Sequence, residues 1–87
     1  MSQQRKVVLQ VATGLHARPS MLLAQKAQSF KSSVRLKTAN REVDAKSILE
    51  LLTLAAEKGA EITVQADGED ETQAVDALVA FLAQVGT

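Results

Sequence analysis

Residues 14–19, Gly-Leu-His-Ala-Arg-Pro, concentrate the residue types that could do chemistry. They include the chain's only histidine, His16, and its only proline, Pro19. A neutral imidazole is a usable nucleophile near neutral pH, and its attack on phosphorus would give a phosphoramidate. Arg18 adds a permanent cation whose planar guanidinium suits phosphate oxygens. On these residues alone, phosphoryl chemistry is one hypothesis beside a surface histidine without a chemical role.

A helix is predicted to start immediately after this histidine. Apolar residues recur there at helical spacing, at Leu23, Ala27 and Phe30. Pro19 is tolerated only in a first turn, so the helix begins at Ala17 or at Pro19 itself. His16 then lies at or just before a helix N-terminus, where free amides and the helix dipole favour an anion.

The remaining elements follow from alternation and helical periodicity. Strands are expected over residues 6–11, 33–38, 41–44 and 62–67, because apolar and polar residues alternate there. A second helix is expected from 48 to about 58, with a buried stripe at Ile48, Leu51, Leu52 and Ala55. A third helix is expected to begin in the acidic run 69–71, with a stripe at Val75, Leu78, Val79 and Leu82.

The order βαββαβα predicts an α+β two-layer open-faced sandwich. Its four-stranded antiparallel sheet carries all three helices on one face, because each strand has a single apolar face. With 87 residues the chain is expected to be one domain, residues 1–87.

Ser47 precedes the second helix and matches a capping box with Glu50, three residues later. As an N-cap, Ser47 is expected to stabilise the helix by about 1 kcal/mol.

Composition excludes several classes of function. The formal net charge is zero and neither Trp nor Tyr occurs, which argues against nucleic-acid binding. Cysteine is absent and only one histidine is present, so we expect no disulfide, thiol chemistry or metal site. No leader or membrane-length apolar run is evident, so we expect no membrane insertion and a cytoplasmic location. A Ser-His-Asp hydrolase has too little room here for its triad, oxyanion hole and substrate pocket.

Three regions resemble one family, the histidine-containing phosphocarrier proteins (HPr) of the bacterial phosphoenolpyruvate-dependent sugar phosphotransferase system. Residues 14–19 fit the family's active-site motif at every position. Residues 46–49, Lys-Ser-Ile-Leu, resemble the start of its second helix, and residues 67–75 resemble its final strand-to-helix join. The family's element order is the one predicted above.

The resemblance implies a carrier and not an enzyme in the strict sense. His16 would accept a phosphoryl group on Nδ1 from phosphorylated enzyme I and pass it to an enzyme IIA domain. Arg18 and the backbone amides of Ala17 and Arg18 would hold the group, with no cofactor.

Partner docking is expected on the surface around this motif. Leu49 lies outside the predicted buried stripe and is expected to contact an apolar partner patch. Further docking candidates are Leu15, Ser20 and Thr53.

Ser47 has a second interpretation besides capping. In part of the family a kinase phosphorylates the corresponding serine for regulation, which makes Ser47 a candidate phosphosite for a serine kinase/phosphorylase. The regulated relatives usually have Gly where this chain has Glu50, which weighs against that role. The chain also ends without the acidic residues of many relatives.

Two alternatives stay open at the level of the sequence. A nitrogen-branch phosphocarrier would use the same chemistry with other partners, although Lys46 before Ser47 favours the sugar branch. An ACT-like domain that binds a small molecule shares part of the element order but does not need the His-Ala-Arg-Pro sequence.

Overall fold

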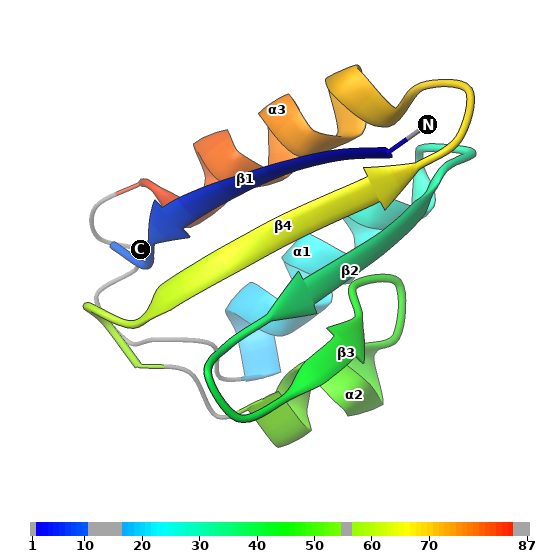
Figure 1. The fold of residues 1–87 in the computed structure, drawn as a ribbon. Helices are drawn as coiled ribbons and strands as arrows, with labels where there is room; N and C mark the ends of the chain where they lie inside the picture. Colours follow the sequence, from blue (N-terminus) through cyan, green and yellow to red (C-terminus); the bar gives the residue numbers. More distant parts are fainter. Residues whose placement is uncertain (1, 11–16, 55–56, 85–87) are drawn as a thin grey trace.

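A computed structural model of the chain describes residues 2–10, 17–54 and 57–84, and shows four strands and three helices (Figure 1). In chain order these are β1 (Ser2–Val8), α1 (Ala17–Gln28), β2 (Ser33–Lys37), β3 (Glu42–Asp44), α2 (Ile48–Leu54), β4 (Glu61–Asp67) and α3 (Glu71–Leu82). The predicted order βαββαβα is confirmed.

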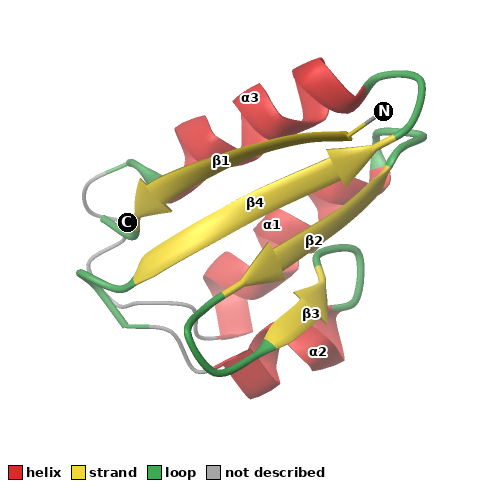
Figure 2. Ribbon diagram, in the orientation of Figure 1, coloured by secondary structure: helices red, strands yellow, loops and turns green. Residues whose placement is uncertain are grey.

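The four strands form one antiparallel sheet in the order β1-β4-β2-β3. β4 is therefore central, although it is last in the chain, and β1 and β3 form the two edges. The helices lie together against one face and leave the other face open (Figure 2). This confirms the predicted open-faced sandwich.

The core between the two layers is aliphatic. α3 packs on β1 and β4, while α2 packs on β3 and against α1. The largest fully buried side chains are aliphatic, among them Leu9, Leu23, Leu36, Leu51, Ile62, Leu78 and Leu82. Because one face of each strand supplies this core, the opposite face carries polar side chains and is free of helices.

β1 begins earlier than its sequence predicts and ends at Val8. The early residues are polar, so alternation gives no signal, but their backbones pair with β4 from Ser2 opposite Asp67 onward. Leu9 is buried as predicted, whereas Val11 lies outside the described residues.

The predicted buried stripe of the second helix is wrong in part. Leu51 is buried, but Ile48 is 37% exposed and Leu52 is 40% exposed. The reason is that α2 packs on β3 and against α1 through the side that carries Leu51 and Leu54, and Ile48 and Leu52 lie outside that contact. Ala55 lies outside the described residues.

The third helix begins at Glu71, so Asp70 is its N-cap residue and not part of its first turn. Its predicted apolar stripe is confirmed at Val75, Leu78 and Leu82, while Val79 is only partly buried.

Candidate functional site

The N-terminus of α1 is the first part of the candidate site. α1 is described from Ala17 to Gln28, and Pro19 is the third of these residues. The first amides of a helix have no intrahelical acceptor, so the backbone amides at the start of α1 are candidate donors to an anion. The first turn holds no acidic residue to occupy them, and Arg18 is exposed. This terminus is therefore suited to an external anion. Leu15 and His16 lie outside the described residues.

Ser20 is not available to a docking partner. It is fully buried, on the same helix side as the core residues Leu23, Ala24 and Ala27. Its hydroxyl oxygen has no hydrogen-bond partner among the described residues. The prediction that Ser20 contacts a partner is wrong, because the spacing 20, 23, 24, 27 places it on the buried face of α1.

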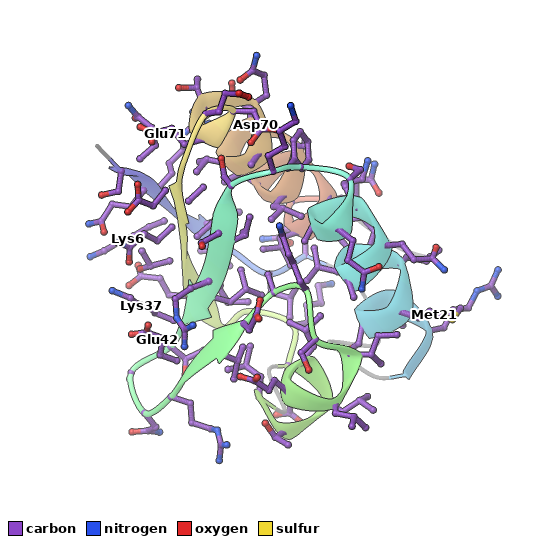
Figure 3. The ribbon with its side chains drawn as sticks, turned by 90° about the vertical axis from the view of Figure 1, so that its right-hand side faces the viewer. Lys6, Met21, Lys37, Glu42, Asp70 and Glu71 are labelled. Carbon is purple, nitrogen blue, oxygen red and sulfur yellow. The ribbon has the colours of Figure 1, made fainter. Side chains whose placement is uncertain are left out.

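α1 and α2, which pack against each other, both carry large exposed apolar side chains. We define this α1–α2 apolar surface by its large exposed residues, Met21, Leu22, Ile48, Leu49 and Leu52. Leu49 is the most exposed of them, at 77%, as the sequence predicts. Figure 3 shows Met21 pointing from α1 into solvent.

Sequence reasoning missed four of these five residues. A signal for α1 was present, because Met21, Leu22 and Leu23 are consecutive and three successive helical residues cannot all face one core. Only Leu23 is buried.

Thr53 is exposed near this surface and is already hydrogen-bonded. Its hydroxyl donates to the carbonyl of Glu50 at 2.6 Å and accepts from Nη2 of Arg41 at 3.3 Å. Arg41 thus connects the β2–β3 turn to α2.

Ser47 caps α2, as predicted. Its Oγ accepts a hydrogen bond from the backbone amide of Glu50 at 3.3 Å, and its carbonyl accepts from Leu51 at 3.0 Å. The second hydrogen bond of the predicted capping box, from the Ser47 amide to the Glu50 carboxylate, does not form. The Glu50 carboxylate accepts from the amide of Asp44, at 3.0 Å, because the Ser47 amide already donates to the carbonyl of Asp44.

Lys46 fixes the start of α2 against the end of α1. Its Nζ donates to the carbonyl of Phe30 at 2.9 Å, and its own carbonyl accepts from Nε2 of Gln28 at 2.8 Å. The two helices that carry the α1–α2 apolar surface are therefore held at a defined distance.

A second fixed point lies beyond the C-terminal end of α1. The carboxylate of Asp70 accepts hydrogen bonds from the amides of Lys31 and Ser32, each at 2.9 Å, and from Oγ of Ser32 at 2.6 Å. The Ser32 hydroxyl is the main cause that lowers the pKa of Asp70 from 3.8 to about 2, followed by the Lys31 amide. Asp70 therefore joins the start of α3 to the loop between α1 and β2 (Figure 3).

The described residues contain no candidate metal site. Across residues 2–10, 17–54 and 57–84, no group of three or more His, Cys, Asp and Glu side chains could hold a metal ion. Within the same ranges, no helix is long and apolar enough to cross a membrane.

Comparison with known proteins identifies the family. The family model for the "PTS HPr component phosphorylation site" matches residues 3–84. The phosphocarrier protein HPr of Cupriavidus necator is 45% identical over 80 residues, covering 92% of this chain and 90% of that protein. The HPr-like protein Crh of Bacillus subtilis is 44% identical over 79 residues, covering 91% and 93%.

The fold agrees with that assignment. The crystal structure of phosphocarrier protein HPr from Bacillus anthracis superposes with a TM-score of 0.90 at 33% identity, and covers 93% of this chain and 96% of that chain. With its sequence matched from residue 3 to residue 84 and its fold shared, this chain belongs to the HPr family of phosphocarrier proteins of the phosphotransferase system.

Proposed function

We propose that this chain relays a phosphoryl group on Nδ1 of His16. The donor is phosphorylated enzyme I, which is charged by phosphoenolpyruvate, and the acceptor is a histidine of an enzyme IIA domain in sugar uptake. In the first step the bond from phosphorus to the donor breaks and a nitrogen–phosphorus bond forms on His16. In the second step that bond breaks, and the group moves to the acceptor. Both partners act in the cytoplasm, where we place this protein.

The observation that carries this proposal is the start of α1, directly after His16, which is suited to bind an anion. Its first turn has the exposed guanidinium of Arg18 and no acidic residue, and the amides of Ala17 and Arg18 are the proposed backbone donors. Each charge-assisted hydrogen bond to a phosphoryl oxygen is worth about 1.5–3 kcal/mol. A few such bonds hold the group loosely enough for it to be passed on.

The α1–α2 apolar surface is the proposed docking site for both partners. It includes Met21 and Leu22, which lie close to the start of α1, and Leu49 on α2. Exposed apolar residues grouped in this way are typical of protein-binding surfaces. Thr53 borders the surface, and Leu15 is included from the resemblance alone.

The similarity to Crh of Bacillus subtilis, described as a catabolite repression HPr, raises a second role in regulation. Paralogues kept only for regulation replace the active-site histidine, and His16 is present in this chain. The carrier function is therefore favoured over a purely regulatory one. Lys46 before Ser47 favours the sugar branch over the nitrogen branch.

Ser47 is the proposed site of regulation by a serine kinase/phosphorylase. Its hydroxyl caps α2 beside the exposed Ile48 and Leu49. A phosphate there would place nearly two negative charges at a helix N-terminus, which tolerates them, and next to the docking surface. Incubation with such a kinase followed by mass spectrometry tests the idea, and absence of modification on Ser47 would refute it.

The relay itself is tested by following a labelled phosphoryl group from phosphoenolpyruvate through enzyme I to a IIA domain. We expect label on the IIA domain only when this chain is present. Arg18→Ala should slow each transfer about tenfold or more, because it removes one charge-assisted hydrogen bond from the site. Lys26→Ala is the matched control, since Lys26 is an exposed cation at the other end of α1. Equal rates for both variants would remove Arg18 from the mechanism.

A further inference from the structure

A groove lies on the open face of the sheet, away from the helices. It has a volume of about 420 Å³ and is lined by Lys6, Lys37, Thr38, Ala39, Asn40, Ala60, Glu61 and Thr63. This volume lies in the range of small-molecule sites, roughly 300–1,000 Å³. The groove is independent of the phosphoryl relay, because α1 and its N-terminus lie on the other face of the sheet (Figure 2).

Sheet register places two lysines on either side of a threonine in the groove. Lys6 in β1 pairs with Thr63 in β4, and Thr63 pairs on its other side with Lys37 in β2. Their neighbours in sequence, such as Ile62, Val64 and Leu36, are buried in the core, so these three residues face the open side. Neighbouring strands are about 4.8 Å apart, which separates the lysine backbones by about 10 Å. Figure 3 shows both lysines on the side of the sheet opposite α1.

The two walls of the groove are fixed by backbone hydrogen bonds. One wall is the β2–β3 turn, where the amide of Thr38 donates to the carbonyl of Arg41 at 2.8 Å, and the Arg41 amide donates to Oγ1 of Thr38 at 3.3 Å. On the other wall the Ala60 carbonyl accepts from the amide of Leu9 at 2.9 Å, and the Ala60 amide donates to Glu57 at 2.9 Å. The groove is therefore formed in advance of any ligand.

The charges of the lining favour a single anionic group. Lys6 and Lys37 give two positive charges, and Glu61 gives one negative charge. Lys37 is also 3.8 Å from Oε1 of Glu42, whose other carboxylate oxygen is bound to Nε of Arg35. Arg35 shares this carboxylate, so its positive charge offsets the negative charge of Glu42.

The uncharged lining favours a ligand that also carries hydroxyl groups. Thr38, Thr63 and Asn40 offer hydroxyl and amide groups, and the Glu61 carboxylate can accept hydrogen bonds from ligand hydroxyls. The same carboxylate would repel a second anionic group. Ala39 and Ala60 leave the space between the walls open.

We propose that this groove binds a small phosphate monoester bearing hydroxyl groups. Its phosphate lies between Lys6 and Lys37, over Thr63, and its hydroxyl groups face Glu61 and Asn40.

Amide chemical shifts of the full-length chain, titrated with glycerol 3-phosphate, test this proposal. We expect saturable shifts at Lys6, Thr63 and Asn40, and a dissociation constant at least tenfold higher in the Lys6→Gln/Lys37→Gln double variant. Lys26→Gln/Lys58→Gln carries the same loss of charge outside the groove and should bind as the unaltered chain does. The amide spectrum of each variant shows whether it is folded.

Ligand controls separate the two parts of the proposal. Inorganic phosphate should bind more weakly than the ester, and glycerol should not bind. Equal binding of phosphate and ester would overturn the role of Glu61 and Asn40. Shifts that do not saturate, that persist in the groove double variant, or that occur only at residues 17–18 would overturn the site itself. None of these outcomes bears on phosphoryl relay by His16.

Discussion

The two ends of α1 are built for different tasks. At the C-terminal end, Asp70 accepts three hydrogen bonds from Lys31 and Ser32, and Lys46 bonds to the carbonyl of Phe30. At the N-terminal end, the first turn has an exposed Arg18, no acidic residue and the α1–α2 apolar surface beside it. We call the C-terminal end the fixed end, because its polar groups form hydrogen bonds within the chain. We call the N-terminal end the open end, because it can bind a phosphoryl group and a partner.

Among variants at the fixed end, Gly68→Ala is expected to destabilise the fold most. Gly68 has a φ of +150°, and an added Cβ would lie 2.8 Å from Cα and from Oγ of Ser32. Backbone strain and steric crowding together should lower the free energy of unfolding by about 3 kcal/mol, measured by urea denaturation.

Gly59→Ala is the matched control for that variant. Gly59 has a φ of +95°, but an added Cβ would meet nothing within 4 Å. Only backbone strain remains, so the loss should be about 1 kcal/mol. Equal losses for the two variants would show that the contact between Gly68 and Ser32 does not matter.

At the open end, Leu49→Gln should damage transfer without damaging the fold. Leu49 is 77% exposed, so its replacement should change the free energy of unfolding by less than about 0.5 kcal/mol. Loss of a central apolar contact should slow transfer from enzyme I about tenfold. Val8→Gln alters an exposed apolar residue on the open face of the sheet and should leave transfer unchanged. If both variants transfer at the normal rate, the α1–α2 apolar surface is not the docking site.

The pH dependence of stability gives the smallest of these effects and reports on Asp70 alone. The Ser32 hydroxyl holds the pKa of Asp70 at about 2 in the folded chain, below its ordinary value of 3.8. The folded state therefore favours the charged form of the Asp70 carboxylate. The stability that this carboxylate contributes is present above pH 4 and is lost as the pH falls towards 2. Asp70→Asn should be less stable than the unaltered chain at pH 6, and the difference should shrink at pH 2.

Asp67→Asn is the control for that measurement, because Asp67 is an exposed carboxylate at the end of β4. A difference between Asp70→Asn and the unaltered chain that is constant from pH 6 to pH 2 would contradict the role given to Asp70.

Sequence periodicity predicted the sheet and the core well, because alternation and helical spacing both depend on which face is buried. Val34, Leu36, Ile62 and Val64 are buried as their alternation predicts. β1 was missed before Lys6, because an edge strand of Ser, Gln and Arg has no apolar face and forms only through its pairing with β4.

Within the candidate site, local patterns predicted the start of α1, the cap at Ser47 and the exposure of Leu49. They did not predict that Ile48 and Leu52 are exposed, because this depends on how α2 packs against α1 and β3. The burial of Ser20 could have been predicted from its helical spacing to Leu23, Ala24 and Ala27. The contact between Asp70 and Ser32 joins residues 38 positions apart, so no local pattern could reveal it.

Site-resolved phosphorylation is the most direct test of the central claim. After incubation with phosphoenolpyruvate and enzyme I, we expect one phosphoryl group per chain, on Nδ1 of His16, labile in acid and stable in base. His16→Ala should accept none under the same conditions and should remain folded. Equal phosphorylation of the alanine variant would contradict the assignment of His16 as the phosphoryl carrier.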